Sequence, residues 1–202
     1  MSSAKLVLAN LFLLLCFSIN VSARPAQTKK RDSLLTTVDN LSEKVIPQVI
    51  SWRRDFHKHP ELGNREFRTS GIIAQYLRSL EMEVVTSVAK TGVIGILKGG
   101  KPGPVVALRA DIDALPVAER NNLDFRSLDS TTYNGQMTAV MHACGHDSHA
   151  AMLMGVAQIL SSIKKDLHGT VKFIFQPSEE GPPAGEEGGA RLMVKEGALE
   201  NP

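Results

Sequence analysis

The chain reads MHACGHDSH over residues 141–149, a stretch that joins a loop to a predicted helix. It contains three histidines, one aspartate and Cys144, which is the only cysteine after the first 23 residues. Thiolate, imidazole and carboxylate groups are the side chains that bind divalent transition metals. Gly145 separates Cys144 from His146, so both can reach one ion, or two adjacent ions, from a tight turn in which a side chain at position 145 would intrude.

Small and apolar residues dominate from position 150 to position 160. This pattern predicts a buried helix that starts just after the cluster, with Asp147 or Ser148 as its N-cap. Taken singly, a buried cysteine is usually a small core residue, and a histidine is more often structural than a ligand. We favour metal binding because the residues occur together and a carboxylate pair, Glu179 and Glu180, follows downstream.

The rest of the domain alternates predicted helices with predicted strands, which indicates the α/β class with a largely parallel sheet and flanking helices. Helices are expected within 34–52, 66–80, 148–160 and 190–196, and strands from 84 and over 92–97, 104–110 and 170–175. The segment 104–110 is apolar throughout, so we expect it to be central in the sheet. Asp111 and Asp113 follow one strand and Glu179 and Glu180 follow another, so the sequence predicts a polar cluster where such sheets carry their sites.

Three further patterns leave choices open. Pro47 starts a second helix or kinks the first one. His57 and His59 stand at alternate positions of a helix end and do not share a face, so we assign them supporting or structural roles rather than ligand roles. Residues 121–135 are polar and predict a loop.

The first 23 residues predict a cleaved signal peptide, with Lys5 before an uncharged leucine-rich run and a small-residue cleavage site at its end. Residues 24–33 predict a flexible leader, and residues 34–202 the folded domain. We therefore expect a secreted, periplasmic or endomembrane-lumen protein without a stable membrane anchor. Removal of Cys16 leaves Cys144 without an intramolecular disulfide partner, which fits a thiolate held by metal.

Composition argues against nucleic-acid binding. The 23 basic and 21 acidic residues leave a net charge of +2, and aromatic residues make up only 5% of the chain. Neither a basic surface nor an aromatic stacking platform for nucleic acid is indicated.

Four motifs occur in an order and at a spacing that resemble one enzyme family: WRRDFHKHPEL over 52–62, LRADIDALP over 108–116, HACGHD over 142–147 and FQPSEEG over 175–181. The family is that of the metal-dependent amidohydrolases, which include hippurate hydrolases, N-acyl-amino-acid amidohydrolases and plant auxin-conjugate hydrolases. The resemblance covers residues 34–202 and implies a two-metal peptidase-like catalytic domain. The implied substrate is a small N-acyl amino acid, cleaved at its amide bond.

The resemblance also implies roles for single residues. Cys144 would bridge two divalent ions, Mn²⁺ or Zn²⁺, with His146 and Glu180 as further ligands. Glu179 would be the general base that takes a proton from a metal-activated water and returns it to the leaving amine. Asp113 matches the family's orienting aspartate, although an aspartate stands two residues before it where related peptidases have histidine.

The sequence lacks two parts of the family pattern. Two further histidine ligands and an inserted lid and dimerisation domain are not found, and His168 precedes its strand, at the wrong end for a ligand. We therefore expect a truncated catalytic domain with an incomplete metal site, and a homodimer only for a full-length form. The alternatives to an active amidohydrolase are a non-catalytic metal-binding fragment and an inactive remnant, and we expect little or no hydrolysis by these 202 residues alone.

Overall fold

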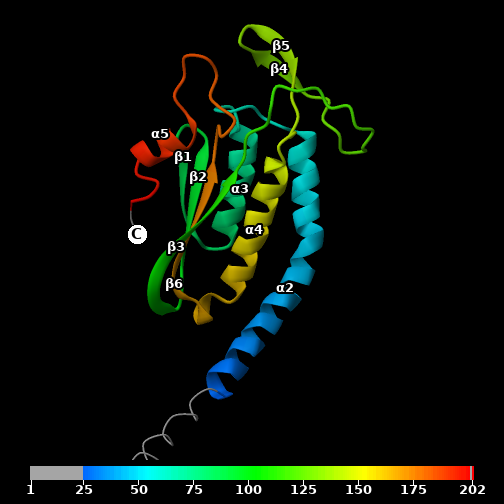
Figure 1. Cartoon of the computed structure of the whole chain (residues 1–202). Helices are drawn as coiled ribbons and strands as arrows, with labels where there is room; N and C mark the ends of the chain where they lie inside the picture. Colours follow the sequence, from blue (N-terminus) through cyan, green and yellow to red (C-terminus); the bar gives the residue numbers. More distant parts are fainter. Residues whose placement is uncertain (1–24, 201) are drawn as a thin grey trace, which may run out of the picture. The chain divides into compact units, whose positions relative to one another are not determined.

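The computed structural model describes residues 25–200 and 202 (Figure 1). The chain divides into two compact units, residues 1–40 and residues 41–202. The described residues of the first unit are helical and form the first part of α2 (Pro25–Lys58). The expected signal peptide lies outside the described residues, whereas residues 25–33 of the expected leader are helical. Over the described ranges, no helix has both the length and the apolar character needed to span a bilayer.

Helix α2 is a single helix that continues through Pro47, which neither ends it nor starts a second one. It runs from Pro25 to Lys58 and is therefore longer at both ends than the helix expected within 34–52. In the second unit, its last turns contribute Phe56, which is fully buried, and Trp52, which packs against the main core. The end of α2 therefore belongs to the domain that carries the candidate site.

A four-stranded sheet forms the centre of the second unit. It consists of β1 (Glu83–Val88), β2 (Gly92–Lys98), β6 (His168–Gln176) and β3 (Lys101–Asp111), in this spatial order. The α/β class is confirmed, but the expectation of a largely parallel sheet is wrong. The pairs β1–β2 and β2–β6 are antiparallel, and β3–β6 alone is parallel. The short connections after β1 and β2 reverse the chain each time, and only β6, which follows a long helix, returns parallel to β3.

Strand β3 lies at the edge of this sheet and not at its centre, contrary to the sequence-based expectation. Its apolar side chains Val105 and Val106 are 47% and 49% exposed. An apolar run identifies a strand, but it does not distinguish an edge strand from a central one. Strand β6 takes the central place, with its last five residues buried.

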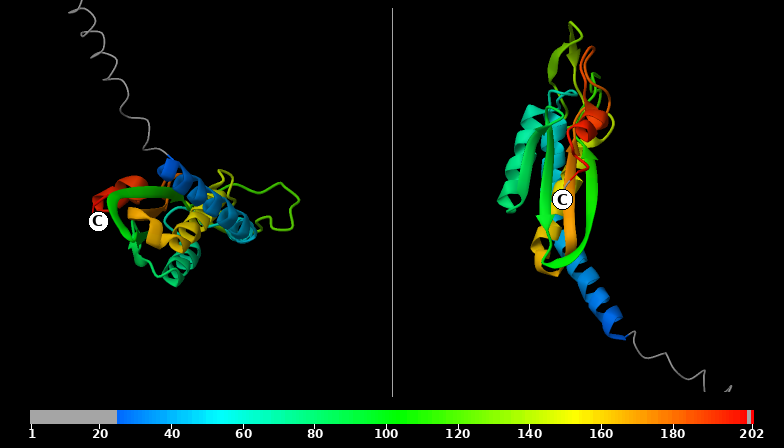
Figure 2. Two further views of the ribbon diagram at one scale, coloured as in Figure 1. Left: turned by 90° about the horizontal axis from the view of Figure 1, so that it is seen from below. Right: turned by 90° about the vertical axis from the view of Figure 1, so that its left-hand side faces the viewer.

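Helices cover both faces of the sheet (Figure 2). Helices α3 (Phe67–Ser79) and α4 (His146–Ser162) pack on one face, and the short α5 (Gly189–Lys195) packs on the other. A 3₁₀ turn, Lys164–Asp166, leads from α4 into β6. Alternation along β6 supplies both cores, because Phe173 and Phe175 face α3 and α4 while Ile174 faces α5.

A two-stranded hairpin stands in the region that the sequence predicted as a loop. Strands β4 (Ser130–Tyr133) and β5 (Gln136–Ala139) pair antiparallel. They are joined by Asn134 and Gly135, which both have positive φ, at 49° and 80°. Asn-Gly is the residue pair that a tight two-residue hairpin turn favours. The prediction of a loop over 121–135 was therefore wrong for residues 130–133, whereas residues 134–135 form the turn of the hairpin.

Candidate metal centre

The carboxyl ends of β3 and β6 meet at one edge of the sheet. Asp111, the last residue of β3, is paired in register with Gln176, the last residue of β6. Because these two strands are parallel, the residues that follow them emerge side by side, as expected from the sequence. An isolated bridge between Leu115 and Met141 brings the 141–149 stretch to the same place.

Helix α4 begins directly within that stretch. Its N-cap is Gly145, with φ at 86°, and not Asp147 or Ser148 as the sequence suggested. The Asp147 carboxylate instead accepts a hydrogen bond from the Ser148 amide at 2.9 Å, inside the first turn. No atom lies within 4 Å of the position that a Cβ at residue 145 would take, so the expected steric intrusion is absent. Glycine suits this position because of its positive φ and not because of crowding.

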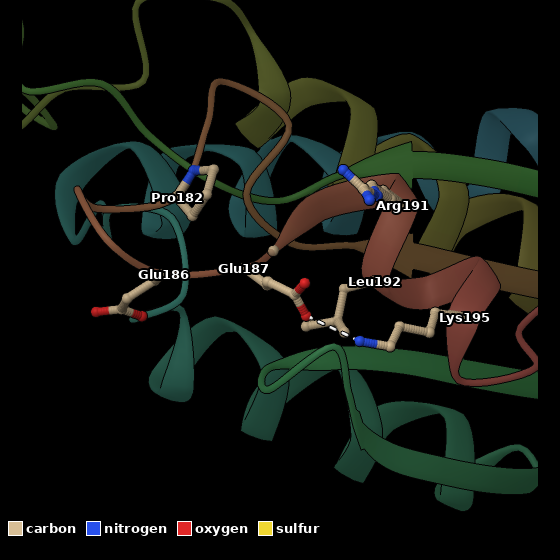
Figure 3. Close-up of a pocket in the computed structure, with 7 residues that line it drawn as sticks. Pro182, Glu186, Glu187, Arg191, Leu192 and Lys195 are labelled. Atoms are coloured by element: carbon tan, nitrogen blue, oxygen red, sulfur yellow. Dashed lines mark hydrogen bonds and ion pairs between the residues drawn. The ribbon is translucent and has the colours of Figure 1, made fainter.

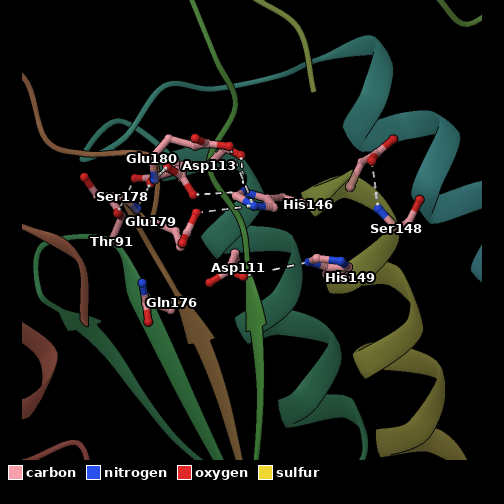
Figure 4. Close-up of polar contacts among 12 residues, drawn as sticks. Thr91, Asp111, Asp113, His146, Ser148, His149, Gln176, Ser178, Glu179 and Glu180 are labelled. Atoms are coloured by element: carbon pink, nitrogen blue, oxygen red, sulfur yellow. Dashed lines mark hydrogen bonds and ion pairs between the residues drawn. The ribbon is translucent and has the colours of Figure 1, made fainter. Parts of the chain in front are cut away.

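Three of the predicted site residues come together at the start of α4. One donor atom from each of Cys144, His146 and Glu180 lies within 4.8 Å of the others. The Nε2 atom of His146 lies 4.0 Å from Glu180 and 3.7 Å from Glu179, which is the predicted base (Figure 4). A thiol, an imidazole and a carboxylate at this spacing form a donor set that Zn²⁺ or Mn²⁺ accepts.

The carboxylate of Asp113 orients two members of this group. It faces Nδ1 of His146 at 3.2 Å, and it accepts a hydrogen bond from the Glu180 amide at 2.9 Å. Burial lowers the pKa of His146, but the hydrogen bond to Asp113 and the negative charge of that carboxylate outweigh burial and raise the pKa to about 9. Asp113 therefore fixes which ring nitrogen of His146 is free, and that nitrogen is Nε2.

Negative charge accumulates around Cys144, whose side chain is exposed. The pKa of its thiol is raised, first by a hydrogen bond with Glu180, then by burial and by the charges of Glu180, Glu179 and Asp111. These carboxylates oppose a free thiolate, and the same field attracts a cation. A bound divalent ion would reverse the balance and favour the thiolate.

A second group of possible donors shares His146 with the first. Asp111, His146 and His149 also present donor atoms within 4.8 Å of one another. Asp111 is engaged in part by Arg109, whose guanidinium lies 2.5 Å from its carboxylate. Figure 4 shows His149 pointing toward Asp111 across the start of α4. His146 has one free nitrogen, so the two groups compete for it.

The histidines at the end of α2 differ from each other. His57 is buried, and its Nδ1 lies 2.8 Å from Asp147 while its Nε2 lies 3.0 Å from Glu119. Asp147 also contacts Arg53 at 2.9 Å. His59 is 42% exposed and faces only Asp129, at 3.7 Å. The predicted supporting role fits His57, because Asp147 directly follows His146 in the chain.

Comparisons with known proteins point to one family. Residues 107–202 match the model of peptidase family M20/M25/M40. The chain is 41% identical over 163 residues to an N-acyl-L-amino acid amidohydrolase of Geobacillus stearothermophilus, covering 81% of this chain and 41% of that one. It is also 41% identical over 194 residues to an IAA-amino acid hydrolase of Arabidopsis thaliana, covering 94% of this chain and 41% of the relative.

The chain is similar to members of the M20 peptidase family. A solved M20 structure from Bacillus subtilis, described as a dinuclear metal-binding peptidase, superimposes with a TM-score of 0.67 at 42% identity. The superposition covers 78% of this chain and 41% of that one. The chain thus spans about 40% of the length of the relatives it matches.

Two further histidines that the sequence analysis named lie outside the donor groups. His168 is the first residue of β6, where its ring faces the carbonyl of Pro102 at 3.3 Å, and the donor group lies beyond the other end of that strand. His142, the first histidine of the cluster, is buried, and neither of its ring nitrogens has a hydrogen-bond partner in the described part of the chain. Burial lowers the pKa of His142 to about 4.

The sequence analysis missed a buried carboxylate near the donor group. Glu66 precedes α3 and accepts a hydrogen bond from the Ser178 amide at 2.8 Å. Its sequence position suggests an exposed residue in the first turn of a helix, and no local signal indicates its burial. Only a pairing over 112 residues of sequence separation brings it to the site.

A pocket of about 300 Å³ lies apart from the donor group, on the α5 side of the sheet (Figure 3). Its charged lining consists of Glu186, Glu187, Arg191 and Lys195. Two of these acids are already paired, Glu187 with Lys195 at 3.1 Å and Glu186 with Arg65 at 2.5 Å. The pocket contains none of the predicted metal ligands.

Proposed function

We propose that this chain carries the metal-binding part of an amidohydrolase that cleaves the amide bond of N-acyl amino acids. One observation carries the proposal: Cys144, His146 and Glu180 converge within 4.8 Å, with Glu179 beside them. Mn²⁺ or Zn²⁺ would be held by these three residues. A divalent ion, when bound, activates water at neutral pH and polarises a carbonyl oxygen.

Glu179 is the proposed general base. It follows β6 immediately before the ligand Glu180, and its side chain is 42% exposed, so substrate and water can reach it. Its carboxylate would take a proton from the attacking water and return it to the leaving amine nitrogen. Of two adjacent glutamates, one can bind metal while the other remains free for proton transfer.

Asp113 is proposed to keep these groups in place during the reaction. It holds the Glu180 amide at 2.9 Å and faces the His146 ring at 3.2 Å. A carboxylate behind a ligating histidine fixes the ring and raises its basicity. The chemistry of the substrate is supported by the relatives, since one is named an N-acyl-L-amino acid amidohydrolase and another an IAA-amino acid hydrolase.

The test measures metal content after dialysis together with hydrolysis of hippurate, a simple N-acyl amino acid. We expect the chain to retain a divalent ion and Cys144→Ala to lose it, because the thiolate is the soft donor of the group. His168→Ala is the matched control, since His168 lies at the opposite end of β6 and should leave metal retention unchanged. Equal metal retention by Cys144→Ala and the unaltered chain would contradict the proposed site.

A second candidate function is metal binding without turnover. The observation in its favour is that both possible donor groups depend on His146, whose Nδ1 is already engaged by Asp113. One free nitrogen serves one ion, so the described residues supply a three-residue site for one ion at a time. Because little or no hydrolysis is expected of these 202 residues alone, one retained ion without hydrolysis fits both functions. Two ions with hydrolysis would contradict this second function and favour completion of the site by a second copy.

We also propose that the protein is exported. The support is the composition of residues 1–23, which have the charge, length and cleavage pattern of a signal peptide. Expression with its own N-terminus in a secretory host, followed by N-terminal sequencing, tests the proposal. Retention of residue 1 on the mature protein would contradict it.

A further inference from the structure

The carboxylate of Glu66 is fully buried, although it takes no part in the donor group. Glu66 occupies the N-cap position of α3, yet its side chain does not cap that helix. Glu61 does so instead, accepting hydrogen bonds from the amides of Arg68 and Thr69 at 2.9 and 2.8 Å. The Glu66 side chain is therefore free to bind elsewhere.

Both oxygens of Glu66 bind residues outside α3. Oε1 accepts the Ser178 amide at 2.8 Å, and Oε2 accepts the hydroxyl of Thr91. Figure 4 shows Thr91 and Ser178 next to Glu179 and Glu180. A carboxylate without solvent costs several kcal/mol to desolvate. The hydrogen bond from the Ser178 amide offsets part of this desolvation penalty, which an apolar side chain at this position would avoid.

Ser178 needs such a contact, because its backbone is in an unfavourable conformation. Its φ is 54°, a left-handed value that is unfavourable for an L-residue. The backbone packs closely around Ser178, since a Cβ on Gly63 would lie 2.7 Å from Ser178 Oγ and one on Gly189 would lie 2.7 Å from its carbonyl oxygen. The hydroxyl of Ser178 has no hydrogen-bond partner in the described residues, so the amide is the group that is held.

The bend at Ser178 sets the direction of the next two residues, Glu179 and Glu180. Glu66 holds the amide before this pair, and Asp113 holds the amide of Glu180 at 2.9 Å. Two carboxylates thus fix a segment of three residues at both ends. The geometry points to Glu66 as a positioning residue that aims Glu179 and Glu180 at the metal. This inference rests on the proposed function, because it assumes that Glu180 binds the ion.

Cobalt(II) binding provides the test, because a cysteine thiolate bound to Co²⁺ gives a charge-transfer absorption band in the near ultraviolet. The 202-residue chain is titrated with Co²⁺, and affinity is expressed per folded molecule, with the folded fraction taken from circular dichroism. Loss of an orienting partner typically lowers metal affinity 10–100-fold, so we expect a loss of at least about tenfold for Glu66→Ala and Glu66→Asp. The aspartate keeps the charge but is too short to reach Ser178.

Two variants separate positioning from general support. Glu66→Gln retains an oxygen for the Ser178 amide, so its affinity should stay within about threefold of the unaltered chain. Glu61→Ala removes the side-chain cap of the same helix without touching Ser178, so it should lower stability and leave the affinity within about threefold. If Glu66→Ala does not fold, the contrast between Glu66→Asp and Glu66→Gln decides.

The possible results distinguish a failure of the positioning role of Glu66 from a failure of the proposed metal site. A cobalt–thiolate band in the unaltered chain that keeps its affinity in folded Glu66→Asp would overturn the positioning role alone. An equal loss in Glu61→Ala would do the same, since the effect would then be general to α3. Absence of the band from the unaltered chain would overturn the proposed metal site, and the positioning role with it.

Discussion

Two sets of acidic side chains lie at the carboxyl ends of β3 and β6, in different surroundings. The carboxylates of the proposed base Glu179 and the proposed ligand Glu180 are 42% and 24% exposed and lie 3.7–4.0 Å from His146. The supporting carboxylates Asp113 and Glu66 are buried and accept amide hydrogen bonds of 2.8–2.9 Å. The carboxylates of the proposed site remain partly exposed to solvent, whereas those that hold the backbone are buried and hydrogen-bonded. Stability and metal affinity should therefore depend on different residues.

The largest loss of stability should follow from removing the buried ring of His57, which contacts none of the proposed metal ligands. His57→Ala removes the ring between Asp147 and Glu119, and we expect the free energy of unfolding to fall by about 3 kcal/mol. His59→Ala, two residues further along, removes a half-exposed ring and should cost less than about 0.5 kcal/mol. Urea unfolding measures the free energy of both variants, and equal losses would contradict the distinction between buried and exposed supporting residues.

A pH series sharpens the comparison on Glu66. Burial raises its pKa from 4.5 to about 7, so between these values the folded chain binds more protons than the unfolded chain. Stability should accordingly fall as pH rises through this window, by about 3 kcal/mol in total. Glu66→Gln has no such proton and should lack this part of the pH dependence. Urea unfolding at several pH values gives the difference, and parallel curves for both proteins would contradict the buried carboxylate.

Asp113 links the two sets, and its substitution should affect affinity more than stability. Asp113→Asn keeps an oxygen that can face the His146 ring or accept from the Glu180 amide, but it removes the negative charge. We therefore expect metal affinity to fall 10–100-fold, about 1.4–2.7 kcal/mol. Competition against a chelating dye measures the affinity. Asp129→Asn is the control, because Asp129 is 50% exposed and its carboxylate faces His59, which is not among the proposed ligands. Unchanged affinity in Asp113→Asn would contradict an orienting role.

The smallest effect concerns the backbone at Ser178. Ser178→Gly removes the penalty of a positive φ and keeps the amide that Glu66 binds, so stability should rise by about 0.5 kcal/mol with metal affinity unchanged. The same change in the exposed middle of α2, Ser51→Gly, should lower stability by about 0.5 kcal/mol. Thermal unfolding compares the two variants, and a loss in both would argue against strain at Ser178.

Local patterns in the sequence identified part of the donor group. Cys144 and His146 were recognised from residue type and spacing, whereas the ligand role of Glu180 came from the family resemblance, and the structure brings the three residues together. The start of α4 was displaced by only a few residues, because a glycine with positive φ serves as the cap where a polar side chain was expected. These features depend on neighbours in the chain, which is what residue patterns report.

Features that depend on distant pairing were not accessible in the same way. The apolar residues of β3 do not reveal that β6 inserts between β2 and β3, so both strand direction and edge position were misjudged. Glu66 could not be identified because its partner lies 112 residues away. The β4–β5 hairpin was different, since Asn134-Gly135 is a local turn signal that was present and overlooked.

The exposed thiol of Cys144 has a consequence for how the protein ages. Peroxide and disulfide chemistry proceed through the thiolate, so a thiol with a raised pKa oxidises slowly. The carboxylates that attract a cation therefore also shield the unliganded sulfur from sulfenic acid formation. A bound metal ion would protect the sulfur in a different way, because it would engage the sulfur electron pair that otherwise attacks an oxidant. Oxidative damage should concentrate in molecules whose neighbouring acids have been neutralised without an ion bound.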